Sequence, residues 1–282
     1  MSKIQSPVDD NLRFKFGENW RKYIANLDED SICVAKKSLQ EGFNVENLNN
    51  KSFLDIGSGS GLFSLAARKL GATVFSFDFD LASVACTTEL KRRYFENDPN
   101  WKIEPGSILD NAYLANLPQF DFVYSWGVLH HTGSMWEAIN NAARLVKDGG
   151  YIFIAIYNDQ GGMSKFWLNV KKLYNRSPIF LQYFILIPFL IRLWGPTILR
   201  DSFHGDPMRT WKNYGKMHRR GMGAWRNLID WVGGLPFEVA KPEEIFQHFS
   251  GEKFSLVKIT TCAGGHGCNE FVFKKINSVV GG

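Results

Sequence analysis

The sequence has little cysteine, with four residues scattered along a chain of 282, at Cys33, Cys86, Cys262 and Cys268. So few and so dispersed, they exclude a disulfide framework and are typical of a protein in a reducing compartment. The gap between Cys262 and Cys268 does not match the short spacing of a zinc knuckle. We therefore predict reduced cysteines and no metal site.

Other features are also missing. The first ten residues, MSKIQSPVDD, lack the apolar core of a signal peptide, which predicts a cytoplasmic protein. The chain has no internal repeat and no low-complexity tract. Its apolar stretch Pro178–Pro196 is too short and too interrupted to be interpreted as a bilayer span. We expect this stretch to be either a buried helix or a helix lying in a membrane interface.

Short apolar segments alternate with amphipathic ones through the first half of the chain. The 45% hydrophobic content is enough for one large core, or for a core with a cap. The expected strands are Lys51–Ile56, Thr73–Asp78, Phe120–Ser125 and Tyr151–Ile156, and the expected helices between them are Leu62–Leu70, Ser83–Phe95 and Met135–Val146. This alternation predicts βαβ units and a parallel sheet.

The pattern divides the chain into four parts. Residues 1–50 form a helical N-terminal segment, and residues 51–157 form the α/β core. Residues 158–226 interrupt the alternation with aromatic, apolar and basic stretches, and we interpret them as a cap. In residues 227–282 the α/β pattern resumes with a helix and two strands, Ser255–Thr261 and Glu270–Lys274, which we expect to complete the core sheet.

The stretch LDIGSGSG, at residues 54–61, joins the first strand to a helix. Glycines allow a positive φ and let backbone N–H groups approach a ligand closely. A dinucleotide fingerprint needs a glycine at position 62, where this chain has Leu62. Asp55, just before the glycines, would repel a pyrophosphate and suits a ligand with an ammonium or sulfonium group.

A second acid, Asp78, ends the next strand about twenty residues later, where an acid accepts hydrogen bonds from both ribose hydroxyls. Phe77 and Phe79 flank it, and one of them could pack on an adenine. Together, the two acids and the glycines predict a site for a nucleoside that carries positive charge.

On these residues the chain resembles the class I S-adenosylmethionine-dependent methyltransferases, in the broad group of the quinone-biosynthesis O-methyltransferases. Five ordered pieces carry the resemblance, namely LDIGSGSG, FSFDFD, EPGSILD, FDFVYSWGVLHH and LVKDGGYIFIAIYN. The resemblance implies a Rossmann-like, doubly wound sheet of seven strands, mostly parallel, with the last strand antiparallel. It also implies S-adenosyl-L-methionine as cofactor.

The resemblance assigns cofactor contacts to motif positions. Asp55 and the loop of Gly57, Ser58, Gly59 and Gly61 would hold the methionine part of the cofactor. Asp78 would hold the ribose, with Phe79 beside it, and Ser107 and Ile108 would lie at the adenine. Trp126 and Gly127 would line the donor pocket. Many relatives carry an acid in place of Ser107, so adenine recognition here could use Ser107, backbone groups or Asp110.

Two histidines follow the fourth strand, at the sheet edge where ligands bind. A hydroxyl acceptor must lose its proton, and a histidine is a suitable base. We favour His131 as the inward-facing catalytic residue, with His130 as the alternative, and a purely structural role for both remains open. Candidate substrate contacts are Tyr157, Tyr214, His266 and Asn269, although the last two could also belong to a simple hairpin loop.

Net charge is +5, and residues 158–226 hold much of the excess. Cations interleave there with aromatic residues, at Arg209, Lys212, Lys216, Arg219, Arg220 and Arg226. A solvated surface explains most such runs. The aromatic interleaving favours an acidic or lipid-linked partner, or peripheral contact with the inner membrane face, and Arg219 and Arg220 are the candidate contacts.

The sequence therefore predicts a methyltransferase that modifies a small molecule, at a hydroxyl oxygen of a sugar or of a polyprenylated, lipid-linked ring. The alternatives are an RNA or protein methyltransferase and a non-catalytic protein that binds the cofactor. No recognisable RNA-binding module is present, which argues against nucleic acid as the partner.

Overall fold

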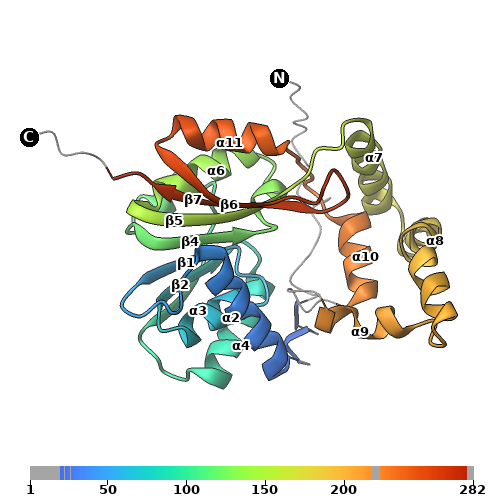
Figure 1. Ribbon diagram of the computed structural model, residues 1–282, viewed down its shortest axis with the longest axis horizontal. Coiled ribbons are helices and arrows are strands. Elements are labelled where there is room, and N and C mark those ends of the chain that lie inside the picture. The colour runs from blue at the N-terminus through green and yellow to red at the C-terminus, as the bar shows by residue number, and fades with distance from the viewer. Residues whose placement is uncertain (1–19, 22, 26, 218–222, 278–282) are drawn as a thin grey trace, which may run out of the picture.

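The computed structural model describes residues 20, 21, 23–25, 27–217 and 223–277. Among them, seven strands form one sheet in the order β3-β2-β1-β4-β5-β7-β6 (Figure 1). The strands are β1 (Ser52–Ile56), β2 (Thr73–Asp78), β3 (Trp101–Pro105), β4 (Phe120–Trp126), β5 (Val146–Tyr157), β6 (Phe254–Thr260) and β7 (Cys268–Lys275). β1 to β5 pair in parallel, and β7 pairs antiparallel with β5 and β6. The predicted doubly wound sheet with an antiparallel last strand is confirmed.

Helices cover both faces of this sheet (Figure 1). One face carries α6 (Met135–Arg144) and α11 (Pro242–Gly251), and the short elements α5 (Asn111–Leu114) and η2 (Leu129–His131) adjoin it. The opposite face carries α2 (Glu29–Phe43), α3 (Leu62–Lys69) and α4 (Leu81–Tyr94). Strands of a sheet that is covered on both sides have nearly continuous apolar sequences, which is why the core strands could be predicted from the sequence.

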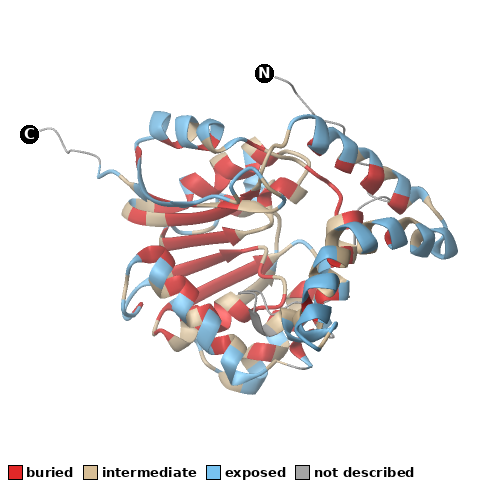
Figure 2. Cartoon of the chain, turned by 45° about the vertical axis from the view of Figure 1, so that its right-hand side comes forward, coloured by how far each residue is buried: buried red, intermediate tan, exposed pale blue. Residues whose placement is uncertain are grey.

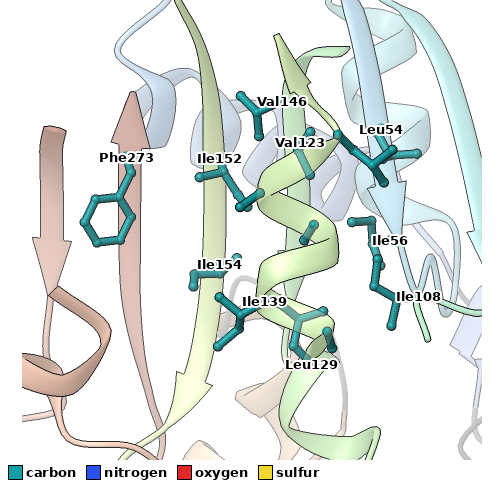
Figure 3. Packing of buried hydrophobic residues seen from close by; sticks show 14 of the residues in the cluster. Leu54, Ile56, Ile108, Val123, Leu129, Ile139, Val146, Ile152, Ile154 and Phe273 are labelled. Atoms are coloured by element: carbon teal, nitrogen blue, oxygen red, sulfur yellow. The ribbon is translucent and has the colours of Figure 1, made fainter. Parts of the chain in front are cut away.

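Alternation along the strands decides which side chains meet which helices. In β1, Leu54 and Ile56 face the α6 side, where they pack with Val123, Ile139 and other apolar residues (Figure 3). Phe53 faces the α2 side, where the ring of Phe43 lies 6.3 Å from it, centre to centre. Because side chains alternate along a strand, Asp55 shares the face of Phe53 and points towards α3.

A separate helical cap lies beyond the carboxyl ends of the strands (Figure 1). It consists of α7 (Gly162–Arg176), α8 (Ile179–Phe203), α9 (Arg209–Met217) and α10 (Ala224–Gly233). α7, α8 and α10 share a third apolar cluster that includes Trp167 from α7 and Leu228 from α10, and α9 packs on α8 through rings that contact Trp194. α10 crosses the boundary predicted at residue 226, because that boundary followed charge composition, whereas packing continues to the end of the helix.

The apolar stretch at Pro178–Pro196 forms most of α8, a helix of 25 residues that continues through two internal prolines. The expectation of a buried helix is wrong, because the buried residues of α8 are Leu186, Trp194 and Asp201 alone. Figure 2 shows the outer side of the cap as largely exposed. Among the described helices α8 alone is long and apolar enough to cross a membrane, by length and composition, so the stretch was not too short for a span.

Lys171 on α7 links α7 to α10 inside the cap. Its side chain is fully buried, its ammonium donates to the backbone carbonyl of Trp231, and it lies 4.7 Å from the ring centre of Phe237 and 5.1 Å from that of Trp231. Burial lowers the pKa of Lys171 from 10.5 to about 7, against the opposing charge of Asp230. Burying an ammonium among rings is costly, which is why this pKa falls.

Lys171 should make the protein more stable as the pH rises from 7 to 10. The folded-state pKa of Lys171 lies below the unfolded value, so the unfolded chain binds more protons between pH 7 and 10. Wild type should therefore gain up to about 1.4 kcal/mol per pH unit over Lys171→Met in this window. Urea denaturation at pH 7, 8 and 9 measures the difference. Lys172→Met, at the half-buried neighbouring position, is the control, and parallel curves for Lys171→Met would show that the ammonium is not desolvated.

Candidate functional site

A cavity of about 780 Å³ lies where the carboxyl ends of the parallel strands face the cap helix α10. Its volume lies in the range of small-molecule sites, about 300–1,000 Å³. The predicted cofactor residues that line it are Asp55, Gly57, Ser58, Gly59, Asp78, Phe79, Ser107, Ile108, Trp126 and Gly127. The predicted residues on its other wall are His131 and Tyr157. The fold thus gathers residues that are more than 100 positions apart in the sequence into one site.

The glycine loop after β1 has the backbone geometry that only glycine accepts readily. Gly57, Gly59 and Gly61 have φ of 72°, 56° and 81°. A Cβ on Gly57 would lie 2.4 Å from a methyl carbon of Val128, and one on Gly61 would lie 2.7 Å from the Cα of Thr87. Gly61 is the N-cap of α3 and does not line the cavity, so its part is to shape the loop.

Asp55 lies near the end of β1 on the α3 side and is almost fully buried on the cavity wall. It accepts a hydrogen bond from the hydroxyl of Ser64 at 2.5 Å, and that hydroxyl lies 2.8 Å from the hydroxyl of Ser76. Burial raises the pKa of Asp55 from 3.8 to about 7; the Ser64 hydrogen bond opposes this shift and the nearby charge of Asp78 adds to it. The site therefore holds a carboxylate that a cation would stabilise.

Asp78 ends β2 and joins the glycine loop to the neighbouring strand. It accepts hydrogen bonds from the backbone N–H groups of Gly59 at 2.9 Å and of Asp80 at 2.8 Å. Burial raises the pKa of Asp78 to about 6, although these N–H groups pull it down. Two carboxylates that are both costly to ionise thus share one cavity, which disfavours an anionic pyrophosphate there.

The next part of the wall has aromatic and apolar character. Phe79 lines the cavity with 62% of its surface exposed, whereas Phe77 is buried. Ile108 is buried on the wall, and the Ser107 hydroxyl accepts a hydrogen bond from the N–H of Leu109. Of the two aromatic residues beside Asp78, Phe79 therefore has the more exposed ring.

Asp110, an alternative for adenine recognition, has a different task. Its carboxylate accepts hydrogen bonds from the N–H groups of Ala112 and Tyr113, each at 3.0 Å, and so caps α5. It is not a cavity-lining residue. Trp126, at the end of β4, does line the cavity, and its indole N–H donates to Glu270 at 2.9 Å.

The two adjacent histidines point in different directions. His131 lines the cavity, and its Nδ1 lies 2.5 Å from the backbone carbonyl oxygen of Pro236. A carbonyl oxygen only accepts hydrogen bonds, so Nδ1 carries the proton and Nε2 carries the lone pair of the neutral ring. His130 is fully buried outside the lining and packs on Tyr157, with ring centres 3.9 Å apart.

Only some of the predicted substrate contacts line the cavity. Tyr157 lines the cavity, but Tyr214 does not, and its hydroxyl accepts a hydrogen bond from Asn227, which does. His266 lies off the lining, with Nδ1 donating to the Gln160 side chain at 3.1 Å. Arg219 and Arg220 lie outside the described residues, so their predicted contacts stay predictions.

Asn269 is buried near the start of β7 and is also off the lining. Its side chain accepts from the N–H of Cys262 at 3.1 Å and donates to Asn158 at 3.0 Å. These bonds tie the loop before β7 and the end of β5 to Asn269, and Cys268, the first residue of β7, lines the cavity. Neither Asn269 nor His266 lines the cavity, and their contacts with the acceptor stay predictions.

Sequence reasoning missed the polar face that α10 presents to the cavity. Asn227, Asp230 and Trp231 line it at spacings of three and four residues, so one side of the helix supplies all three. The stretch AWRNLIDWVG is amphipathic with this polar pair on one side, a signal that was present but not interpreted. Trp20 was also missed; its ring packs over Gly59, where a Cβ would lie 3.1 Å from the indole nitrogen.

Within the described residues, no cluster of three or more histidine, cysteine or acidic side chains could hold a metal ion. The four cysteines, all among the described residues, form no disulfide. The described residues that line the cavity provide carboxylates, an imidazole, aromatic rings and backbone groups.

Comparison with known proteins identifies the family of the chain. Residues 28–186, more than half of the chain, match the family described as "Methyltransferase domain". A ubiquinone biosynthesis O-methyltransferase from Pseudomonas fluorescens (strain SBW25) is 31% identical over 113 residues, which cover 40% of this chain and 47% of that protein. A ribosomal protein L11 methyltransferase from Prochlorococcus marinus (strain AS9601) is 36% identical over 157 residues, which cover 53% and 50%. The chain thus spans about half the length of these curated relatives.

Solved structures share the fold at low sequence identity. The magnesium protoporphyrin IX methyltransferase from Synechocystis PCC 6803 with bound S-adenosylmethionine has a TM-score of 0.55 and 11% identity, covering 96% of this chain and all of that one. The 4+2 cyclase SpnF has a TM-score of 0.52 and 9% identity, covering 86% and 80%. At such identities the likeness shows the fold alone. The family match, the strand order and the acid–glycine–acid site together establish that the chain belongs to the methyltransferase domain family, as a class I S-adenosylmethionine-dependent methyltransferase.

Proposed function

We propose that this protein transfers the methyl group of S-adenosylmethionine to a hydroxyl oxygen of a small molecule. The observation that carries the proposal is His131, which lines the cavity with Nδ1 held by the Pro236 carbonyl and the lone pair on Nε2. The ubiquinone biosynthesis O-methyltransferases matched over 40% of this chain support the choice of oxygen.

The residues at the glycine loop fit the cofactor. Asp55 is a buried carboxylate that an ammonium group would stabilise, and Asp78 can accept hydrogen bonds from ribose hydroxyls. Phe79 offers an exposed ring beside them for the base. When bound, the cofactor supplies a sulfonium-activated methyl group, so the protein mainly positions the reactants and excludes water.

The acceptor would occupy the opposite wall, between the sheet edge and α10. Aromatic rings of Tyr157 and Trp231 form one part of this wall, and Asn227 and Asp230 add polar groups to it. No lysine or arginine is among the described residues that line the cavity. This wall suits an uncharged ring or sugar that carries hydroxyl groups, because rings can pack on it and hydroxyls can be hydrogen-bonded.

Nε2 of His131 would take the proton from the acceptor hydroxyl as the oxygen attacks. The hydrogen bond from Nδ1 to the Pro236 carbonyl keeps the ring oriented and stabilises the positive imidazolium that forms. His130 packs beneath Tyr157 and its Nδ1 lies 3.4 Å from the N–H of that residue, which assigns it to positioning the wall.

Two alternatives rest on specific similarities. The ribosomal protein L11 methyltransferase match favours a protein acceptor, and the SpnF likeness shows that this fold also occurs in a cyclase. Incubating the protein with methyl-labelled S-adenosylmethionine and fractionated cell extract separates these possibilities. Label in the small-molecule or lipid fraction supports the proposal. Label in protein or RNA, or none despite cofactor binding, contradicts it.

The acidic pair generates a test of cofactor binding. Asp78→Asn should weaken S-adenosylmethionine binding by about 10- to 100-fold, because charged hydrogen bonds contribute about 1.5–3 kcal/mol. Isothermal titration calorimetry at pH 8 measures the change. Asp110→Asn is the matched control, since Asp110 caps α5 outside the lining and asparagine also caps helices. Unchanged affinity in Asp78→Asn would remove this residue from the donor site.

Asp55→Asn should raise the thermal stability of the protein while it weakens cofactor binding. The folded-state pKa of Asp55 lies above 3.8, so its contribution to stability is lost as the pH rises from about 4 to 7. The ligand-free variant should therefore melt at a higher temperature than wild type at pH 8, with a smaller gain at pH 5, while it binds the cofactor more weakly. Thermal scans at both pH values measure this. A variant less stable than wild type at pH 8 would show that Asp55 is not penalised by burial.

His131→Ala should lower turnover by about two to four orders of magnitude, the usual contribution of a general base, with cofactor affinity nearly unchanged. His266→Ala, off the cavity, is the control and should keep wild-type turnover. Label transfer into the acceptor fraction and calorimetry with the cofactor give the two readouts. Normal turnover in His131→Ala would exclude it as the base.

A further inference from the structure

The outer side of α8 carries an exposed apolar stripe. Phe180, Phe184, Ile187 and Ile191 recur at helical spacing, and each is between 49% and 68% exposed. The stripe continues onto α7, where the exposed ring of Phe166 lies 6.3 Å, centre to centre, from Phe189 of α8. Such a row of large apolar side chains is uncommon on a soluble surface and marks an interaction site.

The inner side of α8 is packed into the cap. Leu186 and Trp194 are buried, and the Trp194 ring contacts Trp211 and Tyr214 at 4.6 and 5.0 Å. A helix held along its side by α7, α9 and α10 cannot leave the cap to cross a bilayer without losing this core. Its length and composition would allow a span, but its packing favours an orientation parallel to a surface.

The segment that carries the apolar stripe has an excess of positive charge. Residues 162–217 hold nine lysines and arginines but only two acids, Asp201 and Asp206. Both acids are engaged: Asp201 lies 3.2 Å from Arg200, and Asp206 lies 3.4 Å from Lys212. The cations near the stripe that are exposed include Lys165, Arg176 and Arg192. An apolar face with exposed cations complements an anionic lipid surface, which offers both acyl chains and phosphate groups.

We propose that α8, with the adjoining face of α7, docks this protein on an anionic membrane, lying in the interface with Phe180, Phe184, Ile187 and Ile191 inserted. A second copy of the chain is the weaker fit, because two caps with the same excess of positive charge would repel each other. The proposal stands apart from the acceptor chemistry, since α8 does not line the cavity.

Vesicle flotation tests the proposal with the full chain. Wild type should float with phosphatidylcholine vesicles that contain phosphatidylglycerol, float far less with phosphatidylcholine alone, and detach as salt rises. The double variant Phe184→Glu with Ile191→Glu should lose flotation. The matched control is Val257→Glu, a similarly exposed apolar position on β6, outside the cap, and it should float like wild type.

A second variant tests the charges. Arg176→Gln with Arg192→Gln should weaken binding to anionic vesicles by about fivefold per cation, since each basic residue near such a surface contributes about 1 kcal/mol. Calorimetry with S-adenosylmethionine checks that every variant is folded, and intact cofactor binding keeps the proposed function separate from this result.

Three results would overturn the proposal. Wild type could stay at the bottom of the gradient with anionic vesicles. The Phe184→Glu, Ile191→Glu variant could float as well as wild type. Sedimentation without lipid could show a dimer that this double variant dissolves, which would make the stripe an interface between two copies.

Discussion

The site depends on a single constraint: two carboxylates are held in one partly buried cavity, close to a loop that only glycines can form. Asp55 is fixed by the Ser64 hydroxyl and Asp78 by the backbone of the loop itself, through the N–H of Gly59. Burial makes both costly to ionise, with pKa values of about 7 and 6. In the ligand-free protein it is therefore costly to ionise these two carboxylates. A cationic nucleoside would lower this cost, and the free energy gained would contribute to its binding.

The same geometry orients the acceptor side. β1, β2, β4 and β5 run parallel, so the loops after them converge on one edge, and the cap closes that edge through α10. The bond between His131 and the Pro236 carbonyl joins the loop after β4 to the segment that follows α10. The segment between the cap and α11 therefore orients the imidazole of His131.

The sequence predicted the core because the core obeys local rules. Apolar runs marked β1, β2, β4 and β5, and the acid–glycine–acid order marked the donor site. β3 was not predicted as a strand, because WKIEP alternates apolar and charged residues and is only partly buried. The cap resisted prediction for a different reason. Whether α8 is buried depends on what covers it, and whether Asn227 or Tyr214 reaches the cavity depends on how α9 and α10 pack, which composition does not encode.

The central claim is that ligand binding forces the two acids into their charged form. Calorimetric titration with S-adenosylmethionine at pH 6, repeated in buffers of different ionisation enthalpy, counts the protons exchanged on binding. At this pH the ammonium of the ligand is already protonated, so protons can come only from the protein. The account predicts a net release of protons that disappears in the Asp55→Asn, Asp78→Asn double variant. Binding of wild type with no proton release, or with uptake, would contradict it.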